Sequence, residues 1–144
     1  MFSKSIIWST VVTFLFFYFV PAVFYAATTS CFEEYVLIDI MRTDIMPGIL
    51  AVGVLLLSFA FVHIFQKWSG GVFSNKNGFI FGLWIALLEI ISIGFIRYST
   101  SDAFEAPFYA LDGIYWLAMY TIGGVLVAFA VSYTHLTLPT IAKV

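Results

Sequence analysis

One acidic residue, Glu89, lies inside a long apolar stretch of the sequence, residues 79–96. A carboxyl group that is shielded from water can hold a proton, donate a hydrogen bond or bind a cation. If the stretch is helical, four small or polar residues share one face with it: Gly78, Gly82, Ala86 and Ser92. Small residues allow a second helix to approach closely. The spacing therefore predicts that Glu89 points towards protein or a water-filled cavity, and not towards lipid.

Side chains at the same depth of the neighbouring apolar stretches are the candidate partners of this acid. If successive stretches run in opposite directions, the matching positions hold Tyr18, Ser58 and either Tyr120 or Thr121. We therefore take Glu89, Tyr18, Thr121 and Ser58 as a candidate intramembrane proton or ion site. The alternative is a purely structural role, in which a neutral Glu89 donates a hydrogen bond to Tyr18 or Thr121, since desolvation disfavours the charged form.

The composition indicates that the surrounding medium is a lipid bilayer. Of the 144 residues, 62% are hydrophobic, 20% aromatic and only 10% charged, and the mean hydropathy is +1.05. Soluble domains contain roughly 45–50% apolar and about 25% charged residues, so this chain has too few charges to cover a surface that faces water. Six basic residues scattered among eight acidic ones argue against nucleic-acid binding, and a single cysteine excludes a disulfide scaffold.

Four apolar stretches are long enough to cross a membrane: residues 6–27, 49–65, 79–96 and about 110–131. Crossing a hydrocarbon layer of about 30 Å takes roughly 20 residues of helix, and a helix satisfies its own backbone hydrogen bonds where no water is present. The sequence therefore predicts an all-α fold, an antiparallel four-helix transmembrane bundle that forms a single domain over residues 1–130. Residues 32–41 are too apolar for a free loop and too short to span, which predicts a short helix at the membrane surface.

The remaining reactive residues form no recognisable catalytic or metal-binding set. His63 is a secondary candidate, but at about 1.5 Å of rise per residue it lies roughly 10 Å too shallow to touch Glu89, so a proton relay would need water between them. A histidine at the membrane surface is the simpler interpretation. No metal-ligand set, nucleophile with a base or glycine-rich phosphate loop can be assembled. We expect no enzymatic activity, no metal and no cofactor.

The distribution of charge predicts the orientation. Short cytoplasmic loops are enriched in basic residues, and three lysines fall on one side of the membrane: Lys4, Lys67 and Lys76. Arg42 and Arg97 fall on the other, together with seven acids: Glu33, Glu34, Asp39, Asp44, Asp102, Glu105 and Asp112. This predicts a multi-pass protein of the cytoplasmic membrane of a bacterial cell, with both termini in the cytoplasm. Arg97 either extends to the interface or pairs with Asp112 or Asp44.

The C-terminal residues have a separate origin in this interpretation. The run from Val131 to Thr140, VSYTHLTLPT, resembles the translation of a transposon-end sequencing adapter over ten consecutive residues. We therefore expect residues 131–144 to be a non-native tail, which must be excluded from reasoning about the fold.

Short motifs mark the helix ends: Asp44-Ile45-Met46-Pro47, His63-Ile64-Phe65-Gln66-Lys67-Trp68, Gly78-Phe79-Ile80-Phe81-Gly82, Arg97-Tyr98-Ser99-Thr100 and Gly123-Gly124. On these motifs the chain resembles a group of small, uncharacterised bacterial integral membrane proteins with four helices, over most of residues 1–130. The resemblance implies a four-helix bundle. It implies no chemistry, because no activity is assigned to that group.

Three functions follow from these observations. The first is an integral membrane protein without an evident catalytic site. The second is a small proton-coupled transporter or channel subunit that uses Glu89 and works as a homo-oligomer, because four short helices enclose little space. The third is an accessory subunit that docks on a larger membrane complex through some of its 17 phenylalanines.

Overall fold

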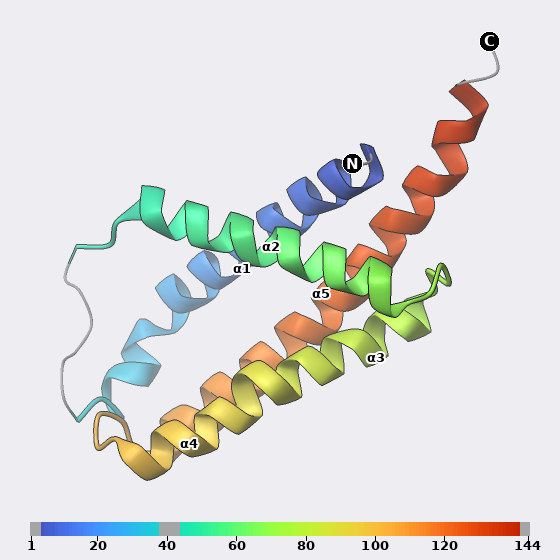
Figure 1. Cartoon of the computed structure of the whole chain (residues 1–144). Helices are drawn as coiled ribbons and strands as arrows, with labels where there is room; N and C mark the ends of the chain where they lie inside the picture. Colours follow the sequence, from blue (N-terminus) through green and yellow to red (C-terminus); the bar gives the residue numbers. More distant parts are fainter. Residues whose placement is uncertain (1–3, 38–43, 142–144) are drawn as a thin grey trace.

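The computed structural model describes residues 4–37 and 44–141, and these are almost entirely helical (Figure 1). The helices are α1 (Lys4–Glu33), α2 (Pro47–Trp68), α3 (Asn75–Ala86), the π-helical turn η1 (Leu87–Ser92), α4 (Ile93–Thr100) and α5 (Ala106–Ile141). Since α3, η1 and α4 follow one another without a break, they form one span, Asn75–Thr100. The four resulting helices are each long and apolar enough to cross a membrane, which confirms the predicted all-α, four-helix fold class.

The helices extend beyond the apolar stretches that predicted them. Helix α1 continues to Glu33 and α5 already begins at Ala106, with Pro107 in its first turn, where a proline costs no backbone hydrogen bond. Asp112 therefore lies in the second turn of α5 and not at its first residues, and its predicted place on the outer side of the membrane stays a prediction. Hydropathy marks the part of a helix that is apolar, whereas the backbone hydrogen bonds continue into the polar residues beyond it.

The short surface helix expected over residues 32–41 does not form in the part that the structure describes. Phe32 belongs to the last turn of α1, and the chain then pairs with the connection between α4 and α5. The Leu37 N–H donates to the Ala103 carbonyl oxygen at 2.9 Å, and the Glu105 N–H donates to the Tyr35 carbonyl oxygen at 3.0 Å. These bonds satisfy backbone groups that a helix would otherwise pair. Residues 38–41 lie outside the described residues.

Helices α3 and α5 touch backbone to backbone along the stripe of small residues. A Cβ atom added to Gly82 would overlap the Tyr120 carbonyl oxygen, and one added to Gly78 would overlap the Gly124 carbonyl oxygen. Because the later residue of α3 meets the earlier residue of α5, these two helices run in opposite directions. The antiparallel course of the whole bundle stays a prediction.

An aromatic core fills the half of the molecule where α1, α2, α3 and α5 meet. The Phe61 ring of α2 lies 5.4 Å from the Phe17 ring of α1 and 4.9 Å from the Phe81 ring of α3, centroid to centroid. The opposite half is built differently, because α2 makes no extensive contact with η1 or α4. Figure 1 shows the ends of α1, α4 and α5 meeting there, with the beginning of α2 standing apart.

Helix α5 runs past Ala130 without a break. The buried Thr134 hydroxyl hydrogen-bonds to the Ser5 hydroxyl of α1 at 2.6 Å. A helix propagates into the residues that follow it whatever their origin, so the non-native origin of residues 131–144 stays a prediction.

The contact between α3 and α5 predicts the response to a single methyl group. Gly82→Ala should lower the free energy of unfolding by about 1–3 kcal/mol, because the added Cβ has no room between the two backbones. Gly53→Ala on α2 is the matched control, since nothing lies within 4 Å of its Cβ position. Unfolding by denaturing detergent, followed by circular dichroism, measures both. Equal stability of the two variants would contradict the close approach.

Candidate functional site

Glu89 occupies a π-helical turn, where the hydrogen-bond pattern of a helix widens by one residue. The turn η1 covers Leu87–Ser92, and the Ser92 hydroxyl donates to the Leu87 carbonyl oxygen, five residues earlier, at 2.8 Å. Such turns occur mostly as single insertions in α-helices and often at functional sites. Nothing in the sequence predicted this one, because the stretch contains neither proline nor glycine at the turn itself.

The Glu89 side chain lines a cavity of about 360 Å³ between α1, the α3–η1–α4 span and α5. Arg97 of α4, Asp112 of α5 and Tyr25 of α1 line the same cavity, together with aromatic residues such as Phe104. Two carboxyl groups and one guanidinium group therefore surround one space. We expected Glu89 to point towards protein or a cavity, and here it lines a cavity. Its side chain is nevertheless exposed in the structure, which contains this chain alone.

A chain of hydrogen bonds joins α1 to α5 at one wall of this cavity. The Tyr25 hydroxyl donates to Asp112 Oδ1 at 2.5 Å, and the Trp116 indole N–H donates to the Tyr25 oxygen at 2.8 Å. Asp112 and Trp116 are four residues apart and so share one face of α5. Sequence reasoning missed this cluster, because no local pattern connects Tyr25 with residues about 90 positions away.

The charges in the cavity are unevenly balanced. Arg97 and Asp112 line the same cavity as Glu89, although the described part of the chain has no Arg97–Asp112 contact within ion-pair distance. No described basic side chain lies within ion-pair distance of Glu89 either. Two carboxyl groups therefore share the cavity with one guanidinium group that contacts neither of them.

Two of the expected partners of Glu89 are buried but bond within their own helices. The Thr121 hydroxyl donates to the Leu117 carbonyl oxygen at 2.8 Å, and the Ser58 hydroxyl donates to the Val54 carbonyl oxygen at 2.7 Å. Neither residue lines the cavity of Glu89. Matching by depth assumed parallel axes, whereas the beginning of α2 stands apart from the α4 end of the molecule (Figure 1).

The third expected partner, Tyr18, is also apart from the acid. Its ring is half-buried on α1 and stacks on Phe14, with ring centroids 5.4 Å apart. Neither of the two alternatives on α5, Tyr120 or Thr121, lines the cavity of Glu89. The structure thus groups Glu89 with Tyr25, Arg97 and Asp112 rather than with Tyr18, Thr121 and Ser58.

His63 lies on the exposed face of α2, and its ring stacks on Phe59 one turn earlier, with ring centroids 5.9 Å apart. It does not line the Glu89 cavity. Over residues 4–37 and 44–141 there is no group of three or more histidine, cysteine, aspartate or glutamate side chains that could hold a metal ion.

Comparison with protein-family models, with curated proteins and with solved structures finds no match to this chain. The resemblance to small four-helix bacterial membrane proteins therefore stays a prediction, and any functional conclusion rests on the geometry of the cavity.

Removing one hydroxyl group tests the cluster of Tyr25, Asp112 and Trp116. Tyr25→Phe should lower the free energy of unfolding by about 1–3 kcal/mol, because it leaves a partly buried carboxyl group without its donor. Tyr18→Phe is the matched control, since no described residue hydrogen-bonds to the Tyr18 hydroxyl. Thermal unfolding in the same detergent compares the two variants. A Tyr25→Phe protein as stable as Tyr18→Phe would argue against the bond.

Proposed function

We propose that this chain is a multi-pass protein of the bacterial cytoplasmic membrane that binds a proton or a monovalent cation at Glu89, as a small ion-coupled transporter or channel subunit. The observation that carries the proposal is the position of Glu89: a carboxyl group without a basic partner, in a cavity between three helices. A charged group at the centre of a bilayer costs about 2.5–3.5 kcal/mol on insertion scales. Binding a proton or a cation removes that cost, so the site favours occupation.

The surroundings of Glu89 suit repeated binding and release. The acid lies in a π-helical turn, and such single turns inside α-helices occur frequently at functional sites. Asp112, which accepts a hydrogen bond from the Tyr25 hydroxyl, and Arg97 add further polar groups to the lining of the same cavity. The absence of a nucleophile with an adjacent base favours transport or ion binding over catalysis.

The small size of the chain favours assembly. Four helices enclose only limited space, and a homo-oligomer or a larger membrane complex would supply a continuous path across the bilayer. The alternative function, an accessory subunit, requires a larger partner protein. It does not require ion binding at Glu89.

Carbodiimide modification tests the proposed site directly. Dicyclohexylcarbodiimide reacts with protonated carboxyl groups in apolar surroundings, so Glu89 should be modified in native membranes. Intact-mass and peptide mass spectrometry locate the adduct. Glu89→Gln should lose it, whereas Glu105→Gln, in the connection before α5, should keep it. Failure of Glu89 to react at any pH would overturn the proposal and leave the accessory role.

Chemical labelling of the single native cysteine tests the orientation of the chain in the membrane. Cys31 is exposed in the last turn of α1, on the side predicted to lie outside the cytoplasm. A membrane-impermeant maleimide should therefore label it in intact cells with an opened outer membrane. A Cys31→Ser protein that carries Val72→Cys, at a position in the connection between α2 and α3 that is 60% exposed, should label only after lysis. The reverse pattern would place both termini outside.

A further inference from the structure

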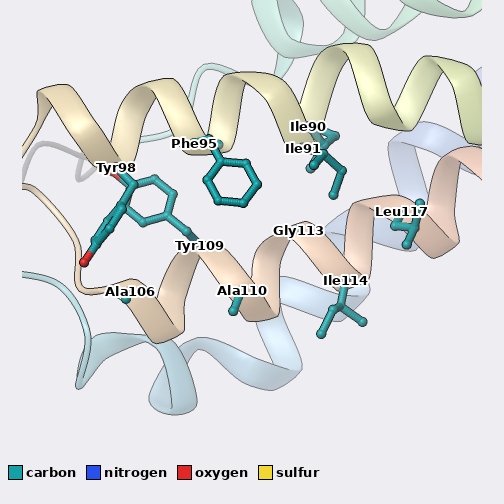
Figure 2. Close-up of a pocket in the computed structure, with 11 residues that line it drawn as sticks. Ile90, Ile91, Phe95, Tyr98, Ala106, Tyr109, Ala110, Gly113, Ile114 and Leu117 are labelled. Atoms are coloured by element: carbon teal, nitrogen blue, oxygen red, sulfur yellow. The ribbon is translucent and has the colours of Figure 1, made fainter.

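A second cavity lies against the one that contains Glu89. It also measures about 360 Å³ and is bounded by η1, α4 and α5, without α1 or α2. Figure 2 shows Phe95 and Tyr98 of α4 facing Tyr109 and Gly113 of α5 across this space. We call it the apolar cavity, and the one with Glu89 the polar cavity. Four residues line both cavities and so form a shared wall: Ile90, Gly94, Tyr109 and Gly113.

The apolar cavity opens onto the outer surface of the helices. Three of its lining side chains are largely exposed, with exposed fractions of 73% for Phe95, 66% for Ile114 and 54% for Tyr98. In a membrane this surface contacts acyl chains, so the apolar cavity opens sideways into the bilayer. A molecule dissolved in the lipid can therefore reach it without passing through water.

Two glycines, Gly94 and Gly113, lie in the wall that the cavities share. Nothing lies within 4 Å of the Cβ position of either one. The glycines of the α3–α5 crossing are the opposite case, because a Cβ at Gly78 or Gly82 would overlap the partner backbone. At the crossing, small residues bring two helices together, whereas at the shared wall the space beside them is open.

The charges favour a cation in the polar cavity. Glu89 and Asp112 carry two potential negative charges against the single positive charge of Arg97. Asp112 already accepts a hydrogen bond from the Tyr25 hydroxyl, so the carboxyl group left to attract a positive ligand is that of Glu89. Aromatic rings of Tyr25 and Phe104 line the same space, and aromatic faces attract cations. The adjoining apolar cavity offers room for hydrocarbon or aromatic groups.

We propose that the two cavities form one site for a lipophilic monovalent cation, which reaches Glu89 from the bilayer through the gap between Gly94 and Gly113. The inference rests on the proposed function, because the cation takes the place of the proton at Glu89. In that exchange the O–H bond of the Glu89 carboxyl group breaks, the proton leaves to water, and the carboxylate then balances the charge of the cation.

A pair of ions of equal shape and opposite charge tests the site. The full chain in lipid nanodiscs should bind tetraphenylphosphonium at least about tenfold more tightly than tetraphenylborate. Equilibrium dialysis against empty nanodiscs corrects for partition into lipid. Glu89→Gln should abolish this preference. Binding of the cation should also release protons, which a weakly buffered solution with a pH indicator detects.

The passage is tested by filling it. Gly113→Leu should weaken tetraphenylphosphonium binding at least about tenfold, and Gly94→Leu on the facing helix should do the same, so a folding defect in one variant leaves the other to decide. Gly53→Leu is the control, because its Cβ position on α2 is equally open but lies outside both cavities. Unchanged binding in a folded Gly94→Leu or Gly113→Leu protein would overturn the lateral passage.

The two proposals fail in different ways. Equal binding of the two ions would show that the cavities hold lipid chains or any apolar molecule, and would overturn the cation site. If carbodiimide still modifies Glu89 in that case, the proposed proton or ion binding stands. If carbodiimide does not react either, both proposals fall.

Discussion

A polar group in hydrocarbon must find its partner within the protein, and the structure depends on this constraint. Backbone groups meet it by forming helices. Most hydroxyl groups meet it within their own helix: Thr13 donates to the Ser9 carbonyl oxygen at 2.7 Å, and Thr28 donates to the Phe24 carbonyl oxygen at 2.7 Å. Four buried side chains of the described residues depart from this pattern: Ser9, Thr10, Gln66 and Tyr115. Glu89 departs from it as a carboxyl group that lines a cavity, because the described residues offer it neither a hydrogen-bond donor nor a basic partner.

The molecule divides into a tightly packed half and an open half. Where α3 crosses α5, the backbones touch at Gly82, and the neighbouring aromatic core excludes space for ligands. Beyond the π-helical turn the span runs on as α4, and two cavities lie between it and its neighbours. The rigid crossing fixes the position of Glu89 at the boundary between the halves. A site beside the close contact of α3 and α5 can bind and release a ligand while the fold is retained.

The sequence predicted the four helices and the position of Glu89 in one of them, because hydrophobicity and length report directly on the medium around a helix. The small-residue stripe also predicted that another helix approaches this span closely, but it did not identify α5 as that helix. Three features could not be predicted. The π-helical turn has no marker residue, the Tyr25–Asp112 bond joins distant parts of the chain, and the divergence of α2 follows from packing of bulky side chains such as Phe61. Depth alone therefore chose the wrong neighbours for Glu89, since it says nothing about crossing angles.

The central claim is that Glu89 points into a polar cavity while its neighbours on the same helix face lipid. Spin labels at position 89 and at Leu88, which is 63% exposed, compare these two environments in one bilayer preparation, in a Cys31→Ser background. Collision with dissolved oxygen reports acyl chains, and collision with a polar nickel complex reports a hydrated space. We expect the label at 88 to favour oxygen and the label at 89 to favour the nickel complex. Equal preference for oxygen at both positions would contradict the account.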